Sequence, residues 1–179
     1  MRKLFAALVA ATTFTATAMI ATPATAALRV GAQAPDFTTT GALAGKPFKL
    51  HLEAALAKGP VVLYFFPKAF TSGCTAEAHA FSESIAAFKK AGAQVIGMSA
   101  DDLPTLEKFS VEECRNAFPV ATAAPATLKA YDVAWAAHPG LASRTSYVIG
   151  RNGKVAMVHD DPDFSKHVAM TLAAVRALK

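Results

Sequence analysis

The sequence predicts an α/β fold in which a mixed central sheet is flanked by helices. Residues 61–66 form a continuously apolar, β-prone run, which is typical of a central strand covered on both faces. An amphipathic helix pattern and a second apolar segment follow this run. Further along, the tight-turn signal Asn152-Gly153 separates two more β-prone segments. These patterns indicate parallel strands joined through a helix, and an antiparallel hairpin added later in the chain.

The first three elements form one strand-helix-strand unit. After the strand at 61–66, apolar residues at spacings of three and four predict a helix over 75–90: Ala78, Phe81, Ile85 and Phe88. Gly92 follows the end of this stripe, as expected just beyond a helix. The apolar segment 94–98 predicts the next strand, parallel to the first.

The rest of the chain supplies a second helix, a hairpin and a closing helix. Asp102 and Pro104 predict the start of a helix over 103–114. Segments 145–149 and 154–158 flank the Asn152-Gly153 turn and predict the hairpin strands. A last helix is predicted from about Phe164, with its apolar side formed by Val168, Leu172, Val175 and Leu178.

Two segments lie outside this series. Residues 37–50 predict a small N-terminal hairpin, and residues 119–143 an insertion between the second helix and the later hairpin. The order strand, helix, strand, helix, hairpin, helix describes a thioredoxin-like fold with an N-terminal hairpin extension.

The first 26 residues have the pattern of a secretory signal peptide. Arg2 and Lys3 precede an apolar stretch, and Ala24-Thr25-Ala26 is a small-residue cleavage motif. A membrane-spanning helix is the alternative, although threonines dilute the apolar stretch and no positive cluster follows it. We therefore expect a signal peptide over 1–26, a single domain over 27–179 with no membrane contact after cleavage, and export, to the periplasm.

The charge of the chain argues against nucleic acid as a partner. The full chain has 18 basic and 13 acidic residues and a net charge of +5. The basic residues are spread singly rather than in a block, so the sequence lacks the pattern of a nucleic-acid-binding surface.

Cys74 has the most distinctive position in the chain. It follows the first strand and precedes the apolar stripe of the helix, which places it in the first helical turn. Unpaired backbone N–H groups and the positive end of the helix dipole there favour a negatively charged thiolate. The position indicates a reactive cysteine rather than half of a structural disulfide.

The residues around Cys74 resemble the peroxiredoxin family. Pro67, Thr71 and Cys74 match its Pro-x-x-x-Thr-x-x-Cys motif, and Gly73-Cys74-Thr75-x-Glu77 looks like the branch that includes the bacterioferritin comigratory protein and peroxiredoxin Q. Three further segments match in the right order: 31–37, 97–101 and 144–149. The resemblance spans nearly all of 29–179. It implies a thiol-dependent peroxidase that reduces hydrogen peroxide or organic hydroperoxides through a cysteine sulfenic acid.

The resemblance also implies roles for individual residues. Cys74 is the nucleophile, Thr71 holds the peroxide in line, Arg144 supplies positive charge, and Pro67 shields the sulfur from water. Glu77 is expected to orient Arg144. Each residue also has a simpler explanation: Thr71 caps the helix, Pro67 ends the strand, Arg144 is an exposed charge, and Glu77 complements the helix dipole.

Cys114 is the only candidate within the chain for a resolving cysteine. Peroxiredoxin Q proteins often have that cysteine five residues after the first, where this chain has His79. Helix 103–114 is expected to carry Cys114 about 15 Å from the active-site edge of the sheet, whereas a disulfide needs Cα atoms within about 7 Å. Ser110-Val111-Glu112-Glu113 resembles a capping box, so the helix is expected to break at 109–110 and leave Cys114 on an easily melted turn. A buried structural thiol and an external thiol remain the alternatives.

No metal or cofactor is expected, since the five histidines have no paired ligand spacing on one helix face. The expected partners are a peroxide and an external thiol reductant, either a thioredoxin-like protein or a small thiol. The expected assembly is a monomer or weak homodimer. A non-enzymatic redox-sensing or binding module is the competing hypothesis, and the combination of Thr71, Cys74 and Arg144 favours the enzyme.

Overall fold

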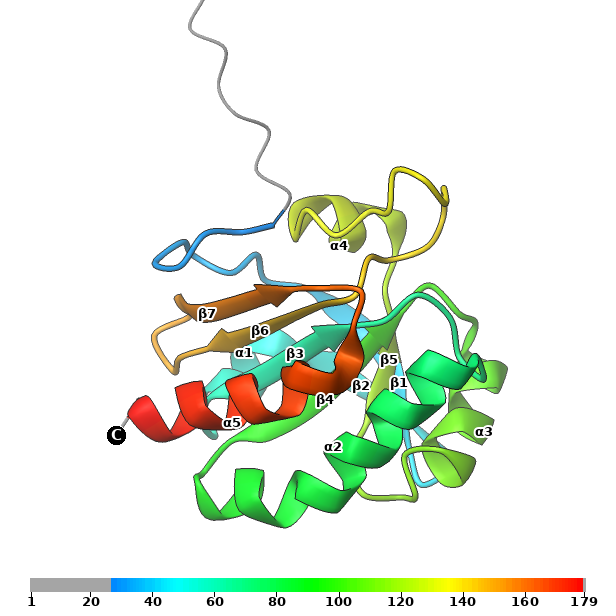
Figure 1. Ribbon diagram of the computed structural model, residues 1–179, viewed down its shortest axis with the longest axis horizontal. Coiled ribbons are helices and arrows are strands. Elements are labelled where there is room, and N and C mark those ends of the chain that lie inside the picture. The colour runs from blue at the N-terminus through cyan, green and yellow to red at the C-terminus, as the bar shows by residue number, and fades with distance from the viewer. Residues whose placement is uncertain (1–26, 179) are drawn as a thin grey trace, which may run out of the picture.

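A seven-stranded mixed sheet forms the centre of the protein, with helices on both faces (Figure 1). The computed structural model describes residues 27–178, so the predicted signal peptide over 1–26 lies outside the described residues. The strand order is β2-β1-β5-β4-β3-β6-β7. The strands are β1 (Thr38–Leu43), β2 (Lys46–His51), β3 (Val61–Phe65), β4 (Gln94–Ser99), β5 (Val120–Thr122), β6 (Thr145–Ile149) and β7 (Val155–Asp160). This arrangement confirms the predicted thioredoxin-like fold.

The pairing of the strands follows from their connections. β3 runs parallel to β4 because helix α2 (Ser72–Lys90) crosses between them, and β4 runs parallel to β5 across helix α3 (Leu103–Glu112). β6 pairs antiparallel with β7, as the turn at 150–154 requires, and it also pairs antiparallel with β3 on its other side. The register of β3 and β6 places Phe65 opposite Thr145. The end of β3 therefore lies beside the start of β6, so residues next to these two strand ends are close in space.

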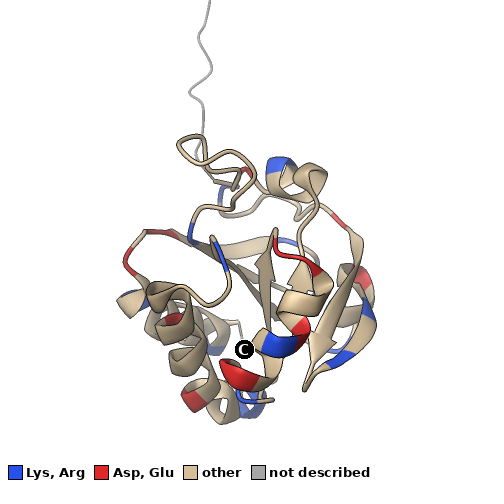
Figure 2. Cartoon of the chain, turned by 90° about the vertical axis from the view of Figure 1, so that its right-hand side faces the viewer, with Lys and Arg blue, Asp and Glu red and all other residues tan. Residues whose placement is uncertain are grey.

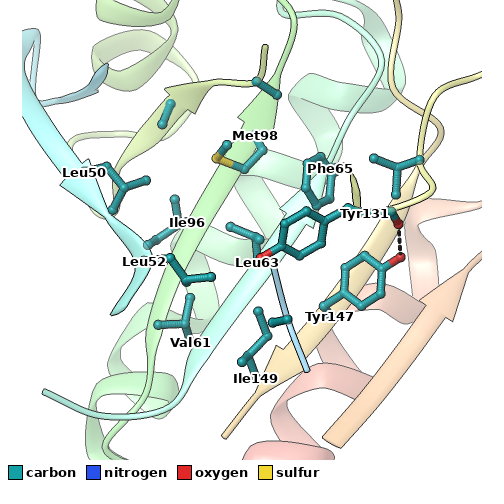
Figure 3. Close-up of a cluster of buried hydrophobic side chains, with 14 of the residues drawn as sticks. Leu50, Leu52, Val61, Leu63, Phe65, Ile96, Met98, Tyr131, Tyr147 and Ile149 are labelled. Carbon is teal, nitrogen blue, oxygen red and sulfur yellow. Dashed lines mark hydrogen bonds between the residues drawn. The ribbon is translucent and has the colours of Figure 1, made fainter. Parts of the chain in front are cut away.

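The two faces of the sheet carry separate clusters of buried side chains. One cluster packs under α2, α3 and α5 (His167–Ala177), which follows a short 3-10 turn at Phe164–Lys166. The opposite cluster packs under α1 (Leu52–Leu56) and α4 (Pro125–Ala130). Figure 3 shows part of the latter, where the Tyr147 hydroxyl donates to the Tyr131 carbonyl at 2.7 Å.

The predicted N-terminal hairpin is present as β1 and β2. Ala44 and Gly45 form the turn with φ angles of 51° and 73°, the left-handed conformation that a two-residue hairpin turn requires. The segment 119–143, predicted as an insertion, is instead partly in the sheet. Its strand β5 fills the place between β1 and β4, and only the remainder, with α4, extends beyond the sheet. Three residues are too few for a recognisable strand pattern in the sequence.

The helix boundaries differ from the prediction at two places. α2 begins at Ser72, three residues earlier than predicted, so Cys74 is its third residue. α3 continues through Glu112 without a break at 109–110, so the capping-box prediction is wrong. The Ser110 hydroxyl donates to the Glu107 carbonyl and accepts from the Gly45 N–H, contacts that hold it inside the helix rather than at a new start. Cys114 then lies in the turn that follows α3.

The apolar side of α5 agrees with the prediction except at its end. Val175 is buried, and Val168 and Leu172 pack against the cluster under the helices, whereas Leu178 is 40% exposed. His167 and Thr171 are buried as well. The hydroxyl of Thr171 donates to the His167 carbonyl at 2.6 Å, so a polar side chain is accommodated inside.

Charges of both signs are interspersed along the helices and loops (Figure 2). Among the described helices, none combines the length and apolar character needed to cross a membrane.

Candidate active site

Cys74 lies at the start of α2, where the chain leaves β3. Its side chain is only 1% exposed. The loop that leads to it is fixed by Asp101, whose carboxylate accepts from the Ala69 N–H at 2.8 Å and from the Ser99 hydroxyl at 2.7 Å. Phe70 adopts a positive φ of 63° and packs edge-on against the Phe109 ring. The strand end and these contacts fix the position of the sulfur at the positive end of a 19-residue helix.

Arg144 reaches Cys74 from the neighbouring strand. It directly precedes β6, whose register with β3 places it at the same end of the sheet. Its Nη2 lies 3.5 Å from Cys74 Sγ, Nη1 donates to Glu77 Oε2, and Nε donates to the Pro162 carbonyl at 3.0 Å. Three acceptors therefore hold the guanidinium in one orientation. The structure brings together Cys74, Glu77 and Arg144, and Arg144 is not an exposed charge.

Gly73 makes room for this approach. A Cβ at position 73 would lie 3.2 Å from Nη2 of Arg144, tighter than almost all real Cβ contacts. The absence of a side chain lets the guanidinium lie over the first helical turn. Backbone N–H groups of that turn have no partner within the helix. The guanidinium and these N–H groups are therefore both donors at the start of α2.

Glu77 is fully buried one turn after Cys74. Burial raises the pKa of Glu77 to about 7, and the contact with Arg144 opposes that rise. Burial would lower the pKa of Arg144, but Glu77 and Cys74 raise it above its ordinary value. The guanidinium is therefore a permanent positive charge beside the sulfur, whereas the carboxyl can change its charge near neutral pH.

Thr71 is the N-cap residue of α2, but its side chain does not cap the helix. Its hydroxyl donates to the Lys68 carbonyl at 3.0 Å, and the side chain is exposed. The capping interpretation of Thr71 is therefore wrong. A hydroxyl that donates in this way still has acceptor lone pairs available.

A pocket of about 330 Å³ opens beside Arg144. It is lined by Pro67, Trp135, Ser143, Arg144, Asp160 and Pro162. Pro67 thus lies in the wall of the pocket beside Arg144. Trp135 is the only tryptophan of the chain, and the sequence interpretation did not single it out. Its loop has no strand or helix pattern that would relate it to Cys74.

Cys114 is buried on the same side of the sheet but away from this site. Burial raises the pKa of the Cys114 thiol well above its usual range. The Ser82 hydroxyl donates to the Cys114 carbonyl at 2.7 Å, and Ser82 lies eight residues beyond Cys74 on α2. Eight residues span about 12 Å of helix. Both cysteines are buried free thiols, with no disulfide between them.

One group of possible metal ligands lies elsewhere on the surface. Asp36, His51 and Glu53 bring their ligand atoms within 4.8 Å of one another. The two oxygens of the Asp36 carboxylate contact His51 Nε2 at 2.7 Å and the Glu53 N–H at 3.0 Å. This group has no contact with Cys74 or Arg144.

The comparisons with known proteins agree with this geometry. A family model described as the AhpC/TSA family matches residues 30–158. The chain belongs to this family. It is a peroxiredoxin of the peroxiredoxin Q-like branch and a thiol-dependent peroxidase.

Similar peroxiredoxins occur in plants and bacteria. Chloroplastic peroxiredoxin Q of Oryza sativa subsp. japonica is 31% identical, over 89% of this chain and 87% of its own length. Chloroplastic peroxiredoxin Q of Arabidopsis thaliana is 36% identical, over 82% of this chain and 67% of its own length. Among solved structures, peroxidoxin BcpB of Mycobacterium tuberculosis superposes with a TM-score of 0.76 at 29% identity, covering 85% of this chain and 99% of that one. Peroxiredoxin Q of Xanthomonas campestris has a TM-score of 0.67 at 28% identity, covering 77% and 89%.

Proposed function

We propose that Cys74 is the peroxidatic cysteine of this peroxiredoxin, and that Thr71, Arg144 and Pro67 complete its reaction site. The observation that carries the proposal is the guanidinium of Arg144, held 3.5 Å from Cys74 Sγ at the N-terminus of α2. A cation and a helix N-terminus at one sulfur favour the thiolate, which is the nucleophilic form.

The reaction follows from this arrangement. The Cys74 thiolate attacks one peroxide oxygen, so that an S–O bond forms while the O–O bond breaks. The sulfur is oxidised to a sulfenic acid, and the expelled hydroxide or alkoxide takes up a proton to give water or an alcohol. Arg144 and the first-turn N–H groups stabilise the negative charge that develops on the leaving oxygen. Thr71 holds the peroxide in line with the sulfur, and Pro67 limits the access of water.

The sulfenic acid is then reduced by thiols. A second thiol condenses with it to form a disulfide and release water, and an external thiol reductant returns both sulfurs to the reduced state. Cys114 is the resolving thiol in this proposal. Since the folded protein keeps it apart from Cys74, that step needs local unfolding.

Whole-protein mass spectrometry tests the proposal. Reduced wild type, Cys74→Ser and the matched Cys114→Ser variant receive one equivalent of hydrogen peroxide, with and without a sulfenic acid trap. We expect a disulfide in wild type, a trapped sulfenic acid in Cys114→Ser and no reaction in Cys74→Ser. Peroxide consumption by Cys74→Ser at the wild-type rate would exclude Cys74 as the nucleophile.

Location and assembly belong to the same proposal. The positive, apolar and small-residue pattern of residues 1–26 supports export to the periplasm, with thioredoxin-like proteins or small thiols of that compartment as reductants. Cell fractionation and the mass of the mature protein test this. We further propose a monomer or weak homodimer, which size-exclusion chromatography over a range of concentrations tests.

A further inference from the structure

The guanidinium of Arg144 is held partly by the main chain beyond β7. Its Nη1 donates to Glu77 and its Nη2 lies 3.5 Å from Cys74 Sγ, whereas its Nε donates to the Pro162 carbonyl at 3.0 Å. Nε is the atom that joins the planar guanidinium to the rest of the side chain, so this bond sets the direction from which the group reaches the sulfur. The position of the Pro162 carbonyl is therefore part of the geometry of the site.

The segment that carries this carbonyl is bound to the strand beside it. The Asp161 N–H donates to the Arg144 carbonyl at 3.2 Å. Asp160 is paired with Thr145 across β6 and β7, and its carboxylate accepts from the Thr145 hydroxyl at 2.8 Å. These contacts use the N–H of Asp161 and the side chain of Asp160. They leave the carbonyl of Asp161 to a different partner.

That partner is His167, the first residue of α5. Its Nε2 lies 2.9 Å from the Asp161 carbonyl oxygen, which can only accept, so Nε2 carries a hydrogen and donates it. Nδ1 lies 2.8 Å from the Ser146 hydroxyl and accepts from it. The residue is 0% exposed, and burial lowers the pKa of His167 to about 4, so the ring is neutral at neutral pH. Both ring nitrogens are thus satisfied in a single tautomer.

The bond from His167 fixes the peptide group between Asp161 and Pro162. This peptide group is planar and the φ angle of proline is fixed, so only the ψ rotation of Pro162 remains between the two carbonyls. The second carbonyl is the one that accepts from Arg144 Nε. We propose that His167 is a positioning residue of the peroxidase. By donating to the Asp161 carbonyl, it fixes the Pro162 carbonyl that orients Arg144 toward the reactive sulfur.

A simpler role for His167 is to fill space at the start of α5. Its ring packs edge-on against His159 with centroids 4.5 Å apart, as a ring without nitrogen atoms could also do. The proposed role instead depends on one atom, the hydrogen on Nε2. Substitutions that keep or remove a donor at this place therefore distinguish the two roles.

Two amide substitutions divide the contacts of the ring. His167→Gln places its amide nitrogen near the position of Nε2, so it can still donate to the Asp161 carbonyl. His167→Asn places its amide near the position of Nδ1, where it reaches Ser146 but not Asp161. His167→Phe keeps the shape of the ring and neither contact. We expect His167→Asn and His167→Phe to reduce hydrogen peroxide about fivefold to tenfold more slowly than wild type, the loss expected for one hydrogen bond, and His167→Gln to recover most of that loss.

A second measurement follows Arg144 directly and does not depend on activity. The Nε–H of Arg144 is hydrogen-bonded, so in NMR of the reduced wild type it should exchange slowly with water. Exchange should be similarly slow in His167→Gln, and about fivefold faster or more in His167→Asn and His167→Phe. Equal exchange in all four proteins would overturn the inference.

Two controls separate this role from a general disturbance of the fold. Thr171→Val removes a buried hydroxyl of α5 that bonds only backbone carbonyls of its own helix, so the peroxide rate and the exchange of Arg144 should stay at the wild-type values. In an Arg144→Ala background, His167→Phe should cause no further loss of rate, because no guanidinium remains to be oriented. A loss that persists in this background would overturn the inference.

A measurement on the wild type does not depend on whether the variants fold. Nitrogen-15 NMR of the imidazole rings should show a neutral His167 at neutral pH, with its hydrogen on Nε2. A hydrogen on Nδ1 alone would contradict the inference, because Nε2 could not donate to Asp161. The peroxide rates rest on the proposed function. Failure of the wild type to reduce peroxide would contradict that function, while the tautomer and the exchange of Arg144 would still test the positioning role.

Discussion

Peroxide oxidation should join Cys74 to Cys114, and the bond should require unfolding of the segments that carry them. The carbonyl of Cys114 is held 2.7 Å from the Ser82 hydroxyl, and Ser82 lies about 12 Å along α2 from Cys74. A disulfide needs Cα atoms within about 7 Å. The Cys114 carbonyl is thus held more than two helical turns beyond Cys74 along α2, so we expect that backbone around at least one cysteine must unwind.

Three contacts hold the turn after α3 against α2. Besides the Ser82 hydrogen bond, His79 Nε2 lies 2.8 Å from Glu113 Oε2, and Arg115 Nη1 donates to Glu83 at 3.2 Å. The two charged pairs are partly exposed and are worth little. The partly buried hydrogen bond to Cys114 is worth about 1 kcal/mol, which is about fivefold in the population of the open turn.

The perturbation is therefore Ser82→Ala. This substitution should speed formation of the Cys74–Cys114 disulfide about fivefold. The reason is that opening of the turn limits the rate at which the sulfenic acid reacts with Cys114. Ser84→Ala is a matched control, the same change on the same helix at a residue without a contact to Cys114. The assay is peptide mapping of samples quenched with an alkylating agent at intervals after one equivalent of peroxide.

Amide exchange supplies a second readout. In the oxidised protein, residues 72–80 and 108–118 should exchange faster than in the reduced protein. Two results would refute the reasoning: no Cys74–Cys114 peptide at any time, or turnover of Cys114→Ser at the wild-type rate. Either result would indicate resolution by an external thiol.

Three further predictions concern the site and the core. Arg144→Ala and Thr71→Val should each slow peroxide reduction by about 10²-fold or more, the scale of one preorganised donor, with an unchanged circular dichroism spectrum; a full-rate Thr71→Val enzyme would place the peroxide contact elsewhere. Trp135→Ala should lower kcat/KM for a bulky apolar hydroperoxide, such as cumene hydroperoxide, about tenfold more than kcat/KM for hydrogen peroxide, because Trp135 forms a wall of the pocket beside Arg144. Equal losses for both substrates would show that the pocket does not select between peroxides. Gly97→Ala should lower the free energy of unfolding by about 1–3 kcal/mol in urea titrations, since its Cβ would lie 2.8 Å from the fully buried ring of Tyr64; unchanged stability would mean that the ring moves aside freely.

The sequence by itself determined the local unit that holds the reactive sulfur. A β-prone apolar run, a short loop and a helical stripe are all encoded by residues close together in the chain. Their order is enough to put Cys74 in the first turn of a helix. The hairpin turn at 44–45 and the parallel pairing of β3 with β4 follow from similarly local patterns and from the handedness of the connection.

Family resemblance extended the prediction to Arg144, seventy residues beyond Cys74. Only the register of β3 with β6 shows how the contact is made, because it places Arg144 beside the end of β3. The sequence also placed Cys114 near a helix end, but by a capping box that the structure does not contain. Ser110 has two hydrogen-bond partners inside the fold, and one of them, Gly45, is 65 residues away.

Only the tertiary structure decided what surrounds the site. Trp135 lies in an irregular loop, and His167 is a polar residue at the start of a helix that otherwise looks amphipathic, so neither has a local pattern that points to Cys74. Their surroundings depend on contacts between distant segments, such as the 2.8 Å between His167 Nδ1 and the Ser146 hydroxyl. A local pattern encodes backbone conformation, but burial and the pairing of distant polar atoms arise only when the whole chain has packed.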